Sequence, residues 1–174
     1  MKWFWISVGM FVFIFFVVLI LGLLQPAKHS ITRSLHLNQK LETVFAVLDN
    51  STNLPNWSAT VMKVESLPDR DGQPSARVTM RWGHMQMIMT QLECTPPTLL
   101  VISMAKEGGP ILGKWTYKLA AENNGCRVTL TEEGEIKNPF FRAIGRMRGL
   151  DANVLQTLRD LTKKFDENAD VRED

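Results

Sequence analysis

The segment from Trp3 to Leu24 constrains this chain most, because it runs for 22 positions without a charged residue. Sixteen of these residues are Leu, Ile, Val or Phe, and Ser7 and two glycines are the only weakly polar positions. A helix of this length reaches about 33 Å, enough to cross a hydrocarbon core of about 30 Å. The sixteen apolar residues supply on the order of −5 to −10 kcal/mol of apparent insertion free energy. We therefore expect residues 1–25 to form an N-terminal transmembrane anchor, with the lipid bilayer as a partner.

A cleaved signal peptide is the alternative reading of this segment. Such a peptide has an apolar core of about 7–15 residues, followed by small residues at the cleavage site. The apolar run here is longer, and Leu23-Leu24-Gln25-Pro26-Ala27 is a poor match to such a site. A buried helix of a soluble core would show a polar face, and this segment has none. The sequence favours an anchor that is retained.

The charges that flank the anchor bear on which side of the membrane the rest of the chain occupies. Lys2 and the α-amino group precede the apolar segment, and Lys28 and Arg33 follow it, so the positive-inside rule is nearly balanced. The very short segment before Trp3 is most simply read as lying inside. We therefore expect a single-pass protein of the cell membrane, with its soluble part on the outer or periplasmic side.

The residues after the anchor have the size of one domain with its own core. Apart from Lys2 the chain carries 19 basic and 18 acidic residues, a balance that argues against nucleic acid as a partner. Cys94 and Cys126 form no C-x-x-C motif, and the three histidines are far apart, so no metal or cofactor site is indicated. A single disulfide stays open. The sequence does not indicate a protein partner.

Hydrophobic patterning predicts an α+β domain. Alternation predicts a strand over 29–37, and helical spacing from Leu41 to Leu48 predicts a helix that ends near Asp49. Turn residues then separate six further strands, whose short connections favour an antiparallel sheet. These strands are expected at 60–67, 76–82, 84–93, 99–105, 113–121 and 127–136.

A closing helix follows the last strand. Asn138 suits an N-cap and Pro139 a first helical position, and one apolar face continues through Ile144 and Met147 to Phe165. The strongly charged tail, residues 167–174, is expected to fray. An antiparallel sheet with one apolar face needs a cover, and this long helix is the element able to supply it. A curved sheet around such a helix encloses a cavity.

Two stretches carry a resemblance to a known superfamily. They are SITRSLHLNQKLETVFAVLDNSTNLPNWS (Ser30 to Ser58) and GKWTYKLAAENNGCRVTLTEEGEI (Gly113 to Ile136). With the closing helix, they resemble the START-like, polyketide cyclase/dehydrase (SRPBCC) superfamily over residues 28–166. Asn38-Gln39-Lys40 departs from the small residues usual before the first helix. The resemblance implies a helix-grip fold over residues 26–166, with about seven strands around the long helix, and a membrane-anchored subgroup is known.

Methionine and aromatic residues are the candidates for a ligand site. Methionine is flexible and polarizable, so a cluster of it suits a pliable apolar ligand, although the same side chains could simply pack the core. Alternation places Met85, Met87 and Met89 on one face of a strand. It places Met80 and Trp82 together on the neighbouring strand. We expect the cavity to be lined by Trp57, Met80, Trp82, Met85, Met87, Met89, Met104, Trp115, Tyr117, Ile144, Met147 and Asp151.

Asp151 is the one charge on the apolar face of the closing helix, so its carboxylate needs water, a basic partner or a ligand. Arg148, three residues earlier, is the nearest partner in sequence. The carboxylate either contacts a ligand headgroup or acts as a base, or it forms a solvated ion pair. The basic residues at the start of this helix suit either anionic lipid headgroups or an ordinary solvated surface. They are Lys137, Arg142, Arg146 and Arg148.

Catalysis has little support in the sequence. No Ser-His-Asp order, phosphate-binding loop or paired carboxylate stands out, and no catalytic residue is assigned. Members of the resembling superfamily bind lipids, sterols, polyketides and hormones, and a minority are cyclases or hydrolases. We expect binding of a hydrophobic small molecule, lipid-like or isoprenoid-like. The alternatives are a cyclase or hydrolase that uses Asp151 or His84, and a module for assembly of an envelope complex.

Overall fold

The computed structural model describes residues 2–106, 111–149 and 151–173; for residues 2, 111, 112, 141 and 146–148 it describes the backbone alone. The chain divides into two compact units, Met1–His29 with Glu135–Leu150 and Ser30–Gly134 with Asp151–Asp174. The elements, in chain order, are α1 (Lys2–Leu23), β1 (Lys28–Leu37), α2 (Leu41–Asp49), the 3-10 helix η1 (Ser51–Asn56), β2 (Val61–Arg70), β3 (Gln73–Met80), β4 (Gln86–Thr95), β5 (Leu99–Ala105), β6 (Ile111–Glu122), β7 (Gly125–Glu135), α3 (Pro139–Arg148), α4 (Ala152–Lys164) and β8 (Arg172–Glu173).

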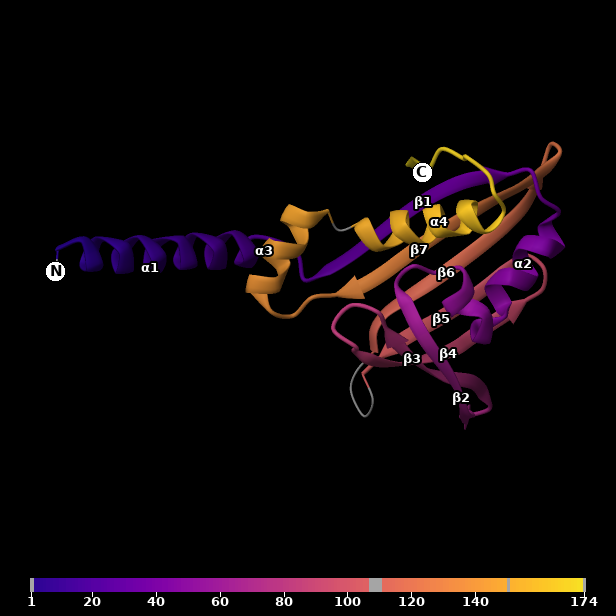
Figure 1. The fold of residues 1–174 in the computed structure, drawn as a ribbon, viewed down its shortest axis with the longest axis horizontal. Helices are drawn as coiled ribbons and strands as arrows, with labels where there is room; N and C mark the ends of the chain where they lie inside the picture. The colour runs from indigo at the N-terminus through magenta and orange to yellow at the C-terminus, as the bar shows by residue number, and fades with distance from the viewer. Residues whose placement is uncertain (1, 107–110, 150, 174) are drawn as a thin grey trace. The chain divides into compact units, whose positions relative to one another are not determined.

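The strands form one antiparallel sheet in the order β2-β3-β4-β5-β6-β7-β1-β8. Figure 1 shows the sheet curving, with α4 lying along it. Side chains alternate along β7, where Cys126, Val128 and Leu130 are buried and their neighbours are less so. The predicted α+β helix-grip fold is confirmed.

One face of the sheet, here called the inner face, packs against α2 and α4. Leu100, Tyr117 and Leu130 lie directly opposite one another on β5, β6 and β7, so they form a row across this face. They belong to a core cluster with three buried residues from each helix. The helix residues are Val44, Phe45 and Leu48 of α2 and Val154, Leu158 and Leu161 of α4.

The closing helix differs from the single helix that the sequence predicts. It is divided into α3 and α4, and Gly149 between them has φ of +85°. A helix cannot contain a residue with that φ, and glycine adopts it without steric strain. The apolar periodicity continues across the break, which is why the sequence pattern alone does not reveal it.

The C-terminal tail also differs from expectation. Residues Arg172 and Ser34 pair between β8 and β1, and Ala169 and Val171 pack against the core cluster. The predicted fraying of this tail is therefore wrong up to Glu173, because two apolar side chains and a short strand hold it to the sheet.

The first unit contains α1 and α3, which pack against each other. Pro139 lies so close to Gly22 that any Cβ at position 22 would collide with its carbonyl oxygen. The rings of Phe15 and Phe140 stack with centroids 6.2 Å apart, and Arg142 donates a hydrogen bond of 2.7 Å to the Gln25 carbonyl. At the start of α3, the Asn138 side chain accepts a hydrogen bond from the Phe140 N–H, as predicted for an N-cap.

Candidate functional site

The inner face of the sheet is only partly covered by α4. This helix has 13 residues and is about 20 Å long, whereas β7, with 11 residues, is about 36 Å long. Tyr117, which belongs to the core cluster with residues of α2 and α4, is 7% exposed. Further along the same strands, Ile102 and Trp115 are half-buried. We call the part of the inner face from Trp115 towards Gly113, away from Leu119, the open end of the inner face.

Two rows of side chains form this open end. Ile102, Trp115 and Glu132 lie opposite one another in the first row, and Met89, Met104 and Gly113 in the second. The indole of Trp115 folds back over Gly113, since a Cβ on that glycine would lie 2.9 Å from the ring. The open end therefore combines aromatic, aliphatic and thioether groups with one carboxyl group. Ile102, Met104 and Trp115 are half-buried, whereas Met89 and Glu132 are buried.

The carboxyl group belongs to Glu132, whose residue is 6% exposed. Burial raises the pKa of Glu132 to about 7, and a hydrogen bond with the Asn153 side chain acts in the opposite direction. Burial also raises the pKa of the nearby Tyr117, and the charge of Glu132 adds to that effect. Glu132 thus changes its charge near neutral pH, while Tyr117 stays neutral there.

Glu132 is absent from the set that the sequence predicts. The signal that could identify it is the alternation of side chains along β7. Cys126, Val128, Leu130 and Glu132 occupy every second position and alternate with less buried residues. Glu133 follows immediately and forms an ion pair with Lys114. Two adjacent glutamates look like the polar end of a strand, although only one of them is solvated.

Asp151 lies immediately before α4 rather than on an apolar helix face. Its carboxylate accepts a hydrogen bond of 2.8 Å from Arg33 on β1, and the same guanidinium lies 2.6 Å from Glu173. The partner suggested by the sequence, Arg148, has no described side chain. Because Arg33 pairs with Asp151, the carboxylate has a structural partner without any ligand.

Apart from Trp82 and Met85, the remaining predicted residues that have described side chains are either buried or half-buried. Trp57, Met87, Met89 and Tyr117 are buried, and Trp57 belongs to the core cluster. Met80, Met104, Trp115 and Ile144 are half-buried, with Ile144 on α3 in the other unit. The side chain of Met147 lies outside the described residues.

Trp82 and Met85 are corrections to the sequence prediction. β3 ends at Met80 and β4 begins at Gln86, so the alternation that placed these two residues on the inner face does not extend to them. The exposed fractions are 79% for Trp82 and 39% for Met85. Gly83 and His84 have positive φ, which breaks both strands at this connection.

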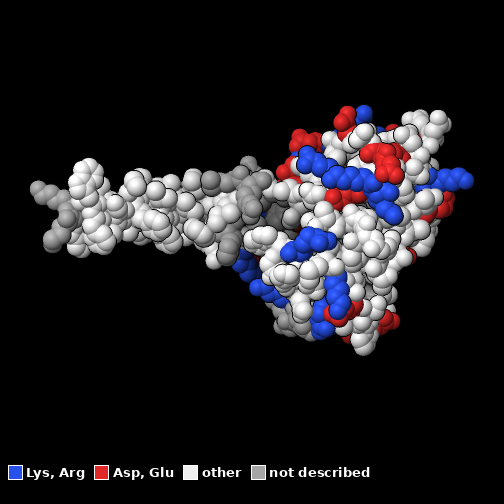
Figure 2. All heavy atoms as spheres, in the orientation of Figure 1, with Lys and Arg blue, Asp and Glu red and all other residues white. Residues whose placement is uncertain are grey.

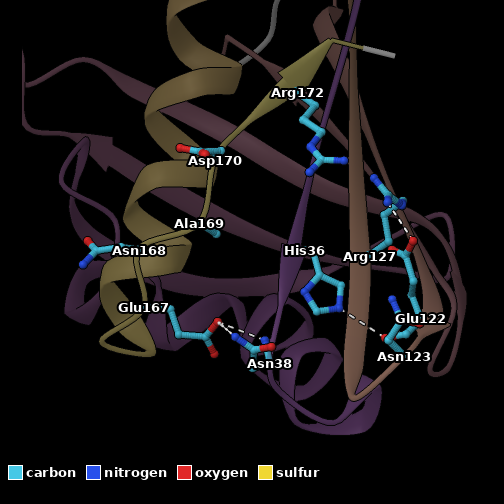
Figure 3. Close-up of a pocket in the computed structure, with 10 residues that line it drawn as sticks. All are labelled: His36, Asn38, Glu122, Asn123, Arg127, Glu167, Asn168, Ala169, Asp170 and Arg172. Atoms are coloured by element: carbon cyan, nitrogen blue, oxygen red, sulfur yellow. Dashed lines mark hydrogen bonds and ion pairs between the residues drawn. The ribbon is translucent and has the colours of Figure 1, made fainter.

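A separate pocket of about 410 Å³ lies in the same unit, lined by the end of β1, the β6–β7 turn and the C-terminal tail. Its groups largely bond to one another, as Figure 3 shows: Arg127 pairs with Glu122 at 2.8 Å, and Glu167 accepts a hydrogen bond of 2.9 Å from the Asn38 N–H. It is polar and mixed in charge, unlike the open end of the inner face.

Several further features bear on what these sites could hold. Within the described ranges, no group of three or more His, Cys, Asp or Glu residues is arranged to bind a metal ion. Cys94 and Cys126 are free thiols. Figure 2 shows basic and acidic side chains interspersed over the visible face of the sheet-containing unit. From Trp3 to Leu23, α1 contains no charged residue.

Comparisons with known proteins agree with this fold. No curated protein matches the sequence. The aromatase/cyclase Zhui from Streptomyces sp. R1128 is similar, with a TM-score of 0.63, 12% identity, and coverage of 79% of this chain and 93% of that chain. Norcoclaurine synthase from Thalictrum flavum gives a TM-score of 0.61, 14% identity, and coverage of 81% and 95%. At such identities the likeness shows the fold alone.

The similarity to larger proteins is partial. The di-domain ARO/CYC protein StfQ from the steffimycin biosynthetic pathway gives a TM-score of 0.63 at 14% identity over 78% of this chain, which spans 49% of StfQ. A family model described as polyketide cyclase/dehydrase and lipid transport matches residues 28–166. The chain belongs to the polyketide cyclase/dehydrase and lipid transport family.

Proposed function

We propose that this protein is a membrane-tethered binding protein for a hydrophobic small molecule, which it holds at the open end of the inner face. The observation that carries the proposal is that Met104 and Trp115 are half-buried on a face that is otherwise core. When a ligand removes half-buried apolar side chains from water, the complex is stabilised by roughly 25 cal/mol per Å² of apolar surface buried.

The side chains of the open end suit a pliable ligand. Methionine adapts its shape to irregular apolar molecules, and an indole provides a large rigid surface. The description of the family includes lipid transport, which agrees with an apolar ligand. A lipid-like or isoprenoid-like molecule fits this surface.

The helix α1 supplies the tether. Its segment Trp3–Leu23 is long and apolar enough to cross a membrane, and few of its side chains are buried. A tether raises the local concentration of a membrane-derived ligand without the need for tight binding. The flanking charges are nearly balanced, and we propose the outer or periplasmic side for the soluble part.

The test is native mass spectrometry of the full chain, released from detergent after exposure to a total lipid extract. We expect a discrete added mass of lipid size. Met104→Trp, which fills the open end, should lose most of it. Met62→Trp is the matched control, because Met62 is 40% exposed on β2 and lies outside the open end.

A wild-type chain free of adduct at every lipid concentration would contradict the proposal and favour the assembly-module alternative. Equal loading of the two variants would show that lipid binds elsewhere.

An enzyme of the cyclase kind is the second candidate, because a buried carboxyl with a pKa of about 7 beside Tyr117 suits proton transfer. The aromatase/cyclase named above shares the fold, although it is only distantly related. Turnover would appear as a change in the mass of the bound molecule over time, abolished by Glu132→Gln without loss of binding.

A further inference from the structure

The chain that leads from β7 into α3 runs back along α1. The Ile136 N–H donates a hydrogen bond of 2.8 Å to the Ala27 carbonyl, which lies beyond the end of α1. Three residues later, Pro139 lies against Gly22, which belongs to α1 itself. Both contacts lie within the first unit. Between them the chain moves from the end of the apolar helix towards its middle.

Phe140 reaches further along α1. Its ring stacks on that of Phe15, with the centroids 6.2 Å apart. Phe15 precedes the last residue of α1, Leu23, by about 12 Å of helix, so the Phe140 ring lies at least about 6 Å inside that end. Arg142 returns to the end of the helix, where it donates a hydrogen bond to the Gln25 carbonyl.

The start of α3 suits an apolar environment. Backbone N–H groups at a helix start lack partners within the helix and are costly to place in lipid. Pro139 has no N–H, and the Asn138 side chain accepts the N–H of Phe140 at 2.9 Å. Phe140 is 37% exposed, so a ring that packs on α1 also presents apolar surface outward.

Positive charge is concentrated in the same unit. Residues 1–29 and 135–150 contain one acidic residue and six basic residues, which leaves 14 basic and 17 acidic residues for the rest of the chain. Lys28 and Lys137 are exposed and directly follow the bonded pair Ala27 and Ile136, so they lie beside the end of α1. The six basic residues are Lys2, Lys28, Lys137, Arg142, Arg146 and Arg148.

We propose that the start of α3 is inserted in the bilayer beside α1, with Phe140 among the acyl chains and with Lys28 and Lys137 at anionic phospholipid headgroups. An aromatic residue beside basic ones is typical of helices that lie in the interface of a membrane. The partner of this surface is an anionic leaflet, the one in which α1 ends. The inference rests on the proposed tether, since it requires α1 to cross the membrane.

The test is photo-crosslinking of the full chain in vesicles of equal parts phosphatidylcholine and phosphatidylglycerol. Benzoylphenylalanine, which reacts with nearby C–H bonds under light, replaces Phe140 and retains its phenyl ring. The same replacement at Phe13, exposed on α1, reports on the tether. Asn124, exposed in the β6–β7 turn beside the C-terminal end of β1, gives the background. Adducts are identified by mass spectrometry of the peptides.

We expect lipid adducts at Phe140 and at Phe13, well above the background at Asn124. At Phe140 the adducts with phosphatidylglycerol should exceed those with phosphatidylcholine by about three- to fivefold, because basic residues attract anionic headgroups.

A pair of charge variants tests the headgroup contact. Lys28→Gln combined with Lys137→Gln should reduce the lipid preference at Phe140 to about half or less. Lys40→Gln combined with Lys118→Gln is the matched control, because it removes two exposed lysines from the other unit, and it should leave the preference unchanged.

Four results would overturn the inference in whole or in part. Lipid adducts at Phe13 without any at Phe140 would refute insertion of α3 and leave the tether intact. Background levels at both positions would refute the tether as well. Adducts of Phe140 with a second copy of this chain in place of lipid would identify a helix-pairing surface. Equal yields of the two lipids at Phe140 would refute the headgroup contact.

Discussion

Glu132 couples the stability of the sheet-containing unit to pH. Its pKa is about 7 in the folded protein, against an ordinary value of 4.5. Between these pH values the folded chain holds a proton that the unfolded chain has lost, so the free energy of unfolding falls as pH rises and levels off above about 7. The total effect is on the order of 3 kcal/mol.

Glu132→Gln should remove this dependence. We expect the variant to gain thermal stability relative to wild type at about pH 8 and to lose most of that advantage at about pH 4.5, where the wild-type carboxyl is neutral in the folded state and only half ionised in the unfolded state. The measurement is thermal unfolding of the full chain in detergent, with Glu133→Gln as the control. A difference between wild type and Glu132→Gln that stays constant with pH would contradict the assignment.

Residue placement follows from the sequence only where strand alternation is uninterrupted. Alternation correctly puts Trp115 and Tyr117 on one face of β6, because twelve strand residues keep their period. It fails at Trp82, because β3 ends at Met80 and Trp82 lies in the turn before β4. The pairing of Asp151 with Arg33 could not be predicted, because 118 positions separate the two residues.

At the scale of elements, the contact between α1 and α3 depends on the absence of a side chain at Gly22. Gly22→Leu should displace α3 from α1, because the new Cβ would collide with the Pro139 carbonyl oxygen. We expect faster tryptic cleavage after Arg142, which donates its hydrogen bond to Gln25 only while the two helices are together.

Gly9→Leu is the matched control for this prediction. It adds the same side chain to the same helix, but an added Cβ at position 9 meets nothing within 4 Å. Equal cleavage rates after Arg142 in wild type, Gly22→Leu and Gly9→Leu would show that the two helices do not depend on this contact.

Most elements could be predicted from local pattern, and the exceptions have a common cause. Strands bounded by Pro, Gly and Asn turns, and α2 with its apolar stripe, are confirmed within a few residues. The division of the closing helix and the addition of β8 could not be derived in this way. Both depend on what distant parts of the chain do, and Gly149 alone is a weak signal within a periodic helix.

At the scale of the whole molecule, the apolar helix α1 should remain part of the protein in the membrane. Its 21 residues that could span a membrane and its poor cleavage site favour an anchor over a signal peptide. We expect the protein to stay with membranes after an alkaline carbonate wash, and its mass-spectrometric digest to contain peptides from Trp3–Leu24. Release by carbonate together with loss of those peptides would indicate a cleaved signal.

The pairing of β1 with β7 also sets the order of events during synthesis. The ribosome delivers β1 directly after α1, but Thr32 and Thr131, which join the two strands through their hydroxyl groups, are 99 positions apart. At roughly 5–20 residues per second, β1 waits about 5–20 s for its partner. Until then it is an unpaired strand a few residues from the apolar helix α1, open to wrong pairing. In the proposed membrane-tethered protein, the sheet would be attached to the membrane before all its strands are paired, so newly made chains should need protection by chaperones until translation is almost complete.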